Sequence, residues 1–393
     1  MKPLLAQATD IQDEVIDARR RLHRDPEVSF KEYRTSQFIK DILGGLGIEI
    51  IDWGGETGVV GLLRGDRPGP VVALRADIDA LPIQEENECS YVSQNKGVMH
   101  ACGHDVHTAC LLGAARLLAE NRENLKGAVK FIFQPAEEVN AGAKAMIAAG
   151  VLENPPVSAI FGLHNNPNIP SGQICLQAGG LMAAVDTTFL TIKGSGGHGA
   201  IPHRTRDPIT AAAAVIQGLQ NIVSRHVDPL EPLVISFGSI HGGDANNVIP
   251  EKVELKGTVR TFSPALRSQM PEQMRSVIDG IASAMRTTAD FVYRQDLPPV
   301  VNPPDLVAWC RTSLEKVFGS GGIVTTAPVM GGEDFACFQE KVPGVFLFLG
   351  VGNPAKGIVH QWHHPQFNID EDGLRFGATA LAQLAVDYLD QHG

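Results

Sequence analysis

Ligand-type side chains are concentrated in the segment Met99–Cys110. Three histidines, one aspartate and two cysteines lie between residues 100 and 110, directly before an apolar pattern with helical spacing. Imidazole, thiolate and carboxylate groups are the side chains that hold zinc, manganese or cobalt in proteins. The segment therefore predicts a metal site at the entrance to a helix.

Cys102 and His104 are the pair in this segment best placed to bind one ion. Gly103 between them allows a turn tight enough to present both side chains together. The alternative is an ordinary capped helix start with Asp105 or Thr108 as the N-cap. Capping would account for those two residues but not for the sulfur and the imidazoles, so metal binding is the favoured interpretation.

Further carboxylates and histidines follow apolar runs that read as strands. Asp77 and Asp79 end one run, Glu137 and Glu138 leave another, and His164 closes a third. Each has a plain structural explanation when taken alone. Ligands in parallel sheets usually lie at the carboxyl ends of strands, so their recurrence there favours one shared site. Two adjacent carboxylates could divide the tasks of metal ligand and general base. A His-rich tract near the C-terminus adds His360, His363 and His364.

The elements that must position these residues alternate between strands and helices. This order predicts an α/β domain with a mostly parallel sheet covered by helices on both faces. The expected strands are 59–63, 71–74, 128–133 and 157–163, and the expected helices are 4–22, 33–43, 108–119, 141–149 and 305–318.

From about residue 185 the pattern changes to βαββαβ, which predicts a compact ferredoxin-like α+β unit. Its expected strands are 186–192, 233–241, 251–262 and 290–294, and its expected helices are 207–226 and 264–286. We therefore expect a catalytic domain in two parts, residues 1–184 and 297–393, with residues 185–296 inserted as a lid or dimerisation domain.

Composition excludes several function classes. The 393 residues carry a formal net charge of −11, which argues against binding to nucleic acid or to an anionic membrane surface. No apolar run is long enough for a transmembrane helix, and the N-terminus lacks the apolar region of a secretion signal, so a cytoplasmic location is expected. The six cysteines are scattered along the chain, which argues against a disulfide framework.

The stretch Gly194–Gly199 formally matches the G-x-G-x-x-G pattern of dinucleotide-binding proteins. Residues 200–206 separate it from the next helix, and no acidic residue follows at the required distance, so we reject that interpretation. A glycine-rich turn that presents His198 is the better account. The sequence also lacks the G-x-S-x-G, G-x-x-x-x-G-K-[ST] and H-E-x-x-H motifs.

Taken together, the motifs resemble the aminoacylase/carboxypeptidase family of di-metal amidohydrolases (peptidase family M20), in particular its hippurate hydrolase or N-acyl-L-amino acid amidohydrolase branch. They follow the family order along nearly the whole chain. The matching segments are Arg75–Pro82, Met99–Ala109, Gln134–Glu138, Gly162–His164, Gly194–His203, Asn247–Pro250, Gly331–Phe335 and His363–Pro365.

The resemblance implies a zinc-exopeptidase-like catalytic domain that binds two divalent metal ions, which could be zinc, manganese, cobalt or nickel. Glu137 would be the general base and His198 a catalytic donor to the oxyanion, from the same or the partner subunit. Asn247 and Arg260 would bind the substrate carboxylate, and Asp105 would orient a ligand imidazole. The implied metal ligands are Cys102, His104, Glu138, His164 and His363.

The implied reaction is hydrolysis of the amide bond of a small N-acyl amino acid by a metal-bridged hydroxide. The implied assembly is a homodimer or homotetramer through the lid. Two alternatives remain open. One is a di-metal carboxypeptidase or dipeptidase, and the other, disfavoured by the intact Glu137–Glu138 pair, is a non-catalytic metal-binding protein on the same fold.

Overall fold

The computed structural model describes residues 2–393, which divide into two compact units. Unit 1 comprises residues 2–179, Val301–Ala327 and Asp334–Gly393, and unit 2 comprises Gly180–Val300 and Pro328–Glu333. The boundaries differ from the expected ones by a few residues at each junction. Residues 328–333, expected in the catalytic domain, belong to unit 2. Two short strands in the connecting segments, β7 (Gly179–Met182) and β14 (Val300–Asn302), pair with each other.

Unit 1 is built on a mixed sheet whose central strands are parallel. Within residues 2–393 the sheet has eight strands in the order β1-β2-β4-β3-β5-β16-β6-β15. The pairs β4–β3, β3–β5 and β5–β16 are parallel, whereas β1–β2, β2–β4 and β16–β6 are antiparallel. The strand bounds are β1 (Glu49–Ile51), β2 (Val59–Arg64), β3 (Arg67–Asp77), β4 (Lys126–Gln134), β5 (Ala159–Pro170), β6 (Ile174–Cys175), β15 (Ile323–Val324) and β16 (Gly344–Gly352).

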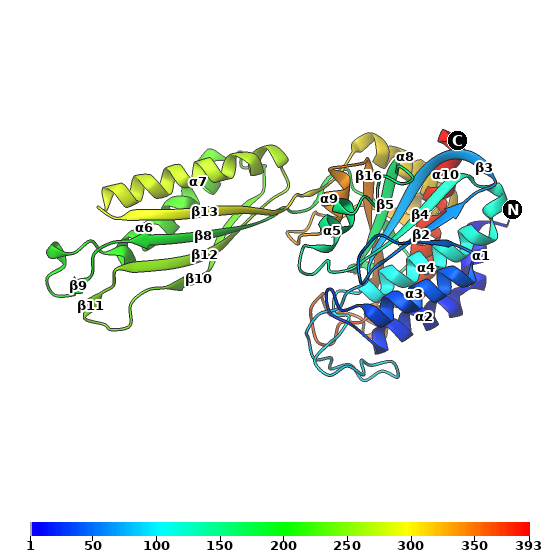
Figure 1. Cartoon of the computed structure of the whole chain (residues 1–393), viewed down its shortest axis with the longest axis horizontal. Coiled ribbons are helices and arrows are strands. Elements are labelled where there is room, and N and C mark those ends of the chain that lie inside the picture. The colour runs from blue at the N-terminus through cyan, green and yellow to red at the C-terminus, as the bar shows by residue number, and fades with distance from the viewer. Residues whose placement is uncertain (1) are drawn as a thin grey trace. The chain divides into compact units, whose positions relative to one another are not determined.

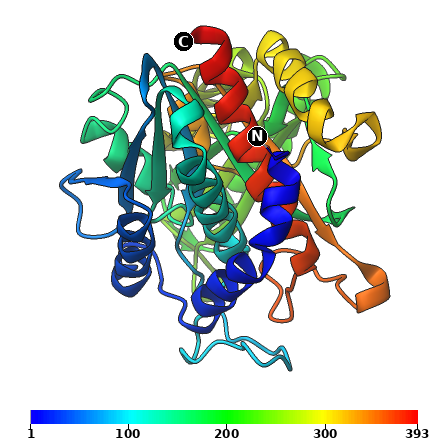
Figure 2. The same cartoon turned by 90° about the vertical axis from the view of Figure 1, so that its right-hand side faces the viewer.

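Helices cover both faces of this sheet, which confirms the predicted α/β class. On one face α4 (His104–Glu120) and α10 (Leu374–His392) pack on each other and on β3, with α1 (Leu4–Asp10) and α2 (Gln12–Arg24) outside them. On the other face lie α5 (Gly142–Ala148) and α9 (Phe335–Gln339) (Figure 1). Figure 2 shows α10 beside the first helices of the chain. The remaining helices of unit 1 are α3 (Tyr33–Gly45) and α8 (Pro304–Phe318).

The single helix expected over residues 4–22 is divided in the structure. Ile11, with φ −100° and ψ 8°, leaves the helical conformation and separates α1 from α2. The preceding Thr9 hydroxyl donates to the Leu5 carbonyl oxygen, and such local side-chain bonds compete with regular helix. Apolar periodicity alone does not reveal this break.

Unit 2 has the predicted βαββαβ order. Its four strands form an antiparallel sheet in the order β10-β12-β8-β13, and α6 and α7 pack on one another and on that sheet. Helix α6 ends at Asn221, and a π-helical turn over Ile222–His226 completes the expected 207–226 segment. A separate pair of short strands joins β9 (Gly197–His198) to β11 (Val248–Ile249). The other bounds are β8 (Val185–Lys193), α6 (Pro208–Asn221), β10 (Leu233–His241), β12 (Lys252–Thr261), α7 (Pro264–Ala284) and β13 (Thr288–Leu297).

Candidate metal centre

The parallel register of β3 and β4 brings two carboxylate-bearing segments to one edge of the sheet. The two strands pair up to Asp77 and Gln134, their last residues. The chain then leaves the sheet at the same level on both strands, so that Asp79 and Glu137 lie close together. The backbone N–H of Glu137 donates to Asp79 Oδ1 at 3.1 Å.

His164 lies inside a strand and not at its end. The expected strand 157–163 is instead β5, Ala159–Pro170. Its pairing with β3 stops at Gly162, but its pairing with β16 continues beyond residue 164 and sustains the strand. His164 therefore lies just past the last pair of β3 with β5, Arg75 with Gly162, and near the level at which β3 ends at Asp77. His164 thus still lies at the edge of the sheet where the carboxylates that follow β3 and β4 are found.

Helix α4 begins four residues before the expected start, at His104. The preceding Gly103 has φ +85°, a left-handed conformation that favours glycine. Neither Asp105 nor Thr108 is the N-cap, because both lie within the helix. The Thr108 hydroxyl donates to the backbone oxygen of Asp77. The capping alternative is therefore wrong, and the early start places the His104 imidazole in the first turn.

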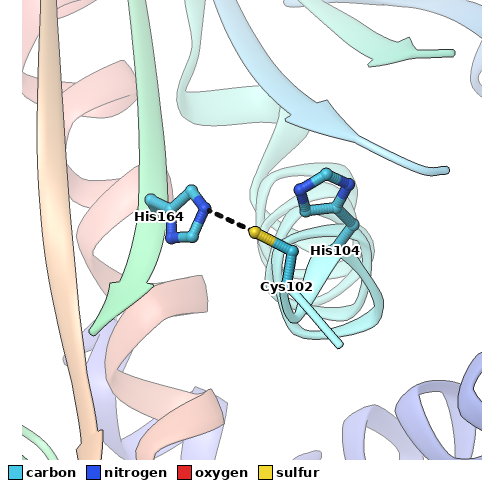
Figure 3. Close-up of side chains that lie close together, drawn as sticks. All are labelled: Cys102, His104 and His164. Carbon is cyan, nitrogen blue, oxygen red and sulfur yellow. Dashed lines mark hydrogen bonds between the residues drawn. The ribbon is translucent and has the colours of Figure 1, made fainter. Parts of the chain in front are cut away.

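The structure brings all five expected metal ligands together with Glu137. The Oε1 of Glu138 lies 3.8 Å from both His104 Nε2 and His363 Nε2, so this carboxylate lies between two of the expected ligands. Cys102 Sγ lies 3.5 Å from His164 Nε2, and Figure 3 shows this pair beside His104. Three groups made up only of the expected ligands and Glu137 have ligand atoms within 4.8 Å of one another: Cys102–His104–His164, Cys102–Glu138–His363 and His104–Glu137–Glu138.

The protonation pattern of the two buried imidazoles suits metal binding. His104 Nδ1 bonds Asp79 Oδ1 at 3.2 Å, and His164 Nδ1 donates to the backbone oxygen of Asn165 at 2.7 Å. Each ring therefore turns its Nε2 toward the cluster. A ligand histidine ordinarily donates its other ring N–H in this way, which fixes both tautomer and orientation.

Two buried polar atoms in the cluster support the presence of a cation. Among residues 2–393, His104 Nε2 and Glu138 Oε1 have no hydrogen-bond partner. Buried polar atoms without partners are rare because their desolvation is not compensated. Burial raises the pKa of Glu138 to about 7, although His104 opposes the shift, and burial raises the pKa of the Cys102 thiol well above its usual range. Bound divalent ions would compensate these groups, and the donor set fits zinc, cobalt or manganese.

Asp79 is the carboxylate that orients both a ligand histidine and the Glu137–Glu138 turn. Besides the contacts of its Oδ1, its Oδ2 accepts from the Glu138 N–H at 3.1 Å and from the Ser29 hydroxyl at 2.7 Å. Burial disfavours its charge, but the bonds from His104 and Ser29 prevail and lower the pKa of Asp79. The sequence placed Asp79 at this edge of the sheet but did not predict these contacts.

Glu32 supports the same turn from a distant part of the chain. Ala136, just before Glu137, has the left-handed φ of +54°, and its N–H donates to Glu32 Oε1 at 2.9 Å. Together with Asp79, this side chain satisfies three successive N–H groups of the turn. Nothing in the sequence connects residue 32 with residue 136, so this support was not predicted.

Asp105 does not contact a ligand imidazole, contrary to expectation. Its Oδ2 instead accepts from Arg19 Nε at 2.7 Å and bonds His23 Nδ1 at 2.8 Å. The other nitrogen of His23 bonds Glu85 Oε1 at 3.0 Å. Asp105 therefore anchors the first turn of α4 to α2 through buried charges.

This network predicts a pH-dependent contribution to stability. Burial and Arg19 oppose a charge on His23, but Asp105 and Glu85 prevail and raise its pKa; the ring of His100 also lies nearby. A folded-state pKa above the unfolded value of ~6.5 stabilises the fold fully below that value and loses its effect as pH rises through the folded-state pKa. Replacing His23 with Gln should therefore lower the free energy of unfolding more at acidic than at alkaline pH. Urea unfolding of the wild type and the variant from acidic to alkaline pH would measure this difference. A loss of unfolding free energy that grows as pH rises would contradict the prediction.

The expected lid residues lie in two places within unit 2. His198 is exposed on β9 and pairs with Val248 of β11, and the Gly199 N–H donates to the Asn247 carbonyl oxygen at 2.8 Å. These residues adjoin the start of β12, where Lys252 pairs with Lys193. Arg260 lies eight residues further along β12, about 26 Å away at ~3.3 Å per residue. The glycine-rich turn leads into β9 and not into a helix, which agrees with the rejection of a dinucleotide site.

No helix within residues 2–393 has both the length and the apolar composition that crossing a membrane requires. Against known families, residues 73–387 match the model of peptidase family M20/M25/M40. The chain belongs to this family. An N-acetylcysteine deacetylase of Bacillus subtilis is 44% identical over 377 residues, which cover 96% of this chain and 97% of the relative. Thermostable carboxypeptidase 2 of Saccharolobus solfataricus is 41% identical over 383 residues, covering 96% of each chain.

Solved structures of the M20 family agree with this fold. The YXEP protein of Bacillus subtilis, described as a dinuclear metal binding peptidase, superposes with a TM-score of 0.86 and 42% identity, covering 97% of this chain and 99% of the other. The chain is therefore a hydrolase of a family that includes dinuclear metal-binding members. Its candidate ligands are clustered at one edge of the unit 1 sheet.

Proposed function

We propose that the protein hydrolyses the amide bond of small N-acyl amino acids with the help of two divalent metal ions. The observation that carries this proposal is the position of Glu137. Its Oε2 lies 4.0 Å from His104 Nε2 in the ligand cluster, and its backbone is held by the buried Asp79. The relative named N-acetylcysteine deacetylase supports an N-acyl amino acid as the substrate class.

The two ions would be held by Cys102, His104, Glu138, His164 and His363. When bound, they would acidify a water molecule and polarise the amide carbonyl of the substrate. Glu137 would accept the proton of that water and return it to the leaving amine. Because the turn that carries Glu137 is fixed through its N–H groups, the carboxylate would be oriented before substrate binds.

Arg260 is the residue that we propose for binding the carboxylate of the amino acid product, together with Asn247. An arginine fork pairs with a carboxylate in a bidentate manner. Burial lowers the pKa of Arg260, but the group remains far from deprotonation at neutral pH. A half-buried guanidinium at the end of a lid strand is therefore available for an anionic ligand.

We further propose a homodimer in which His198 serves the site of the partner subunit. Within one copy of unit 2, His198 and Arg260 are separated by nearly the whole length of β12. A small N-acyl amino acid cannot contact two groups so far apart. If both act on one substrate, they must come from different copies, so Asn247, which adjoins His198, would also come from the partner.

Hybrid dimers test this arrangement. The variants Glu137→Gln and His198→Ala should each be nearly inactive, since loss of an oxyanion donor typically costs ~10²–10³ in rate. Refolding or co-expressing them together should restore activity, because a hybrid contains one site with an intact Glu137 from one chain and His198 from the other. Two His198→Ala chains mixed in the same way provide the control. Hybrids that stay inactive would place His198 in the site of its own chain.

The reaction itself is tested with a substrate panel. N-acetyl and N-benzoyl amino acids should be hydrolysed, with activity lost on chelation and restored by manganese, cobalt or zinc. The runner-up function, a di-metal carboxypeptidase, is favoured by the name of the relative from Saccharolobus solfataricus. Faster turnover of unblocked dipeptides than of N-acyl amino acids would favour that function. No turnover of either class with metal-loaded protein would leave only metal binding.

A further inference from the structure

Asn165, the residue after His164 in β5, contacts three separate segments that carry expected metal ligands. Its Nδ2 donates to the Cys102 carbonyl oxygen at 2.6 Å, and its own backbone oxygen accepts from His164 Nδ1 at 2.7 Å. Its Oδ1 accepts from Trp362 Nε1 at 3.1 Å, and Trp362 directly precedes His363. Asn165 is fully buried. Its side chain thus links the α4 loop to the C-terminal part of the chain, and its backbone oxygen holds the ring of the neighbouring His164.

The orientation of the Asn165 amide is fixed by His107, which is itself held by Asp77. His107 donates from Nδ1 to Asp77 Oδ1 at 2.5 Å, which leaves its Nε2 as an acceptor. That nitrogen lies 2.8 Å from both the backbone N and Nδ2 of Asn165. The amide must therefore present its NH₂ group to His107 and Cys102 and its oxygen to Trp362.

The loop between the first two ligands is shaped to receive this amide. A Cβ added to Gly103 would lie 2.3 Å from Asn165 Nδ2, closer than any real contact. Gly103 is thus required twice, once for its φ of +85° and once for the space that Asn165 fills. The backbone N–H of His363 also donates to the Ala101 carbonyl oxygen at 2.8 Å, so the C-terminal ligand segment meets this loop directly.

We propose that Asn165 is a positioning residue that sets the distances among Cys102, His164 and His363 and thereby the geometry of the metal centre. Its polar atoms all bond to groups beside ligands or to His107, and a purely packing role in the sheet would be filled by an apolar side chain. Asp77 supports this role indirectly, because it holds the His107 ring that accepts hydrogen bonds from Asn165. This inference rests on the proposed metal centre but not on the proposed substrate.

The test is a cobalt titration of the whole chain, followed by the thiolate-to-cobalt absorption of Cys102 and by competition with a chelator. Asn165→Ala should bind cobalt about 10–100-fold more weakly, the usual cost of losing a group that orients a ligand, with an altered absorption spectrum. Asn165→Asp keeps the shape but loses the two donors, so it should show the same defect. Asn166→Ala is the matched control, because Asn166 is also buried in β5 but, within residues 2–393, its side chain accepts only from the N–H of Asn168 in the same strand. It should bind cobalt as the wild type does.

Wild-type affinity and spectrum in both Asn165 variants would overturn the proposal. Failure of both to fold, judged by circular dichroism, would also overturn it, because Asn165 would then maintain the fold and not the ligand geometry. A wild-type chain that binds cobalt but hydrolyses no N-acyl amino acid would refute the proposed function and leave this inference standing. A wild-type chain that binds no cobalt would refute both.

Discussion

Replacement of Glu137 by Gln is expected to lower the rate of N-acyl amino acid hydrolysis by about 10²–10⁴-fold, the usual contribution of a general acid–base group. Gln keeps the shape of Glu but cannot accept a proton. The turn should be preserved, because Asp79 holds it through the backbone N–H groups of residues 137 and 138 and not through the side chains. Metal content should therefore match that of the wild type.

Glu138→Gln provides the comparison for this experiment. Glu138 is shared by two ligand groups, so its loss should release metal as well as activity. Metal analysis together with kcat would separate the two roles of these adjacent carboxylates. Turnover close to the wild-type rate in the Glu137→Gln enzyme would remove Glu137 as the base.

Replacement of Arg75 by Met is expected to destabilise the fold by about 3–5 kcal/mol, the cost of removing one partner from a buried ion pair. Arg75 is fully buried in β3. Its guanidinium donates to Asp77 Oδ2 and Asp334 Oδ1, both at 2.7 Å, and to Gln134 Oε1 at 2.8 Å. Without it, two buried carboxylates would lose their cation. The effect should appear as a lower midpoint in urea unfolding.

Arg64→Met is the matched control for that measurement. Arg64 ends β2, and its pair with Glu49, at 3.5 Å, is exposed on both sides. Exposed pairs contribute only ~0–1 kcal/mol, so this variant should unfold close to the wild-type midpoint. If both variants showed similar small decreases in the urea midpoint, the fold would not need Arg75 to compensate the buried carboxylates around it.

The sequence predicted the classes of both units and the edge of the sheet at which the candidate ligands gather. That success has a simple cause, because strand periodicity and the parallel βα order place Glu137 and Asp79 at the ends of neighbouring strands. The prediction for β5 was wrong at its end, since β16, nearly two hundred residues later, prolongs it by pairing. Pairing partners so far along the chain have no local signal.

The hydrogen bonds that support the site were beyond prediction. Glu32, Asp79 and Asn165 act through hydrogen bonds to backbone atoms of other segments. Residue type alone does not reveal such contacts, and the aspartate that the sequence did favour, Asp105, turned out to bond α2. Likewise, the separation of His198 from Arg260 follows from the register of β12 with β8, which no single strand pattern determines.

The division of unit 1 along the chain has a consequence for its biosynthesis. Cys102, His104, Glu138 and His164 leave the ribosome before unit 2 does, whereas β16 and His363 follow it. Until then the nascent chain carries four of the five proposed metal ligands and an unpaired edge on β5, which is the kind of edge that promotes association with other chains. Unit 2, continuous over residues 180–300 apart from one short segment, can form first. The complete set of proposed metal ligands and the complete sheet of unit 1 should therefore arise together, late in translation.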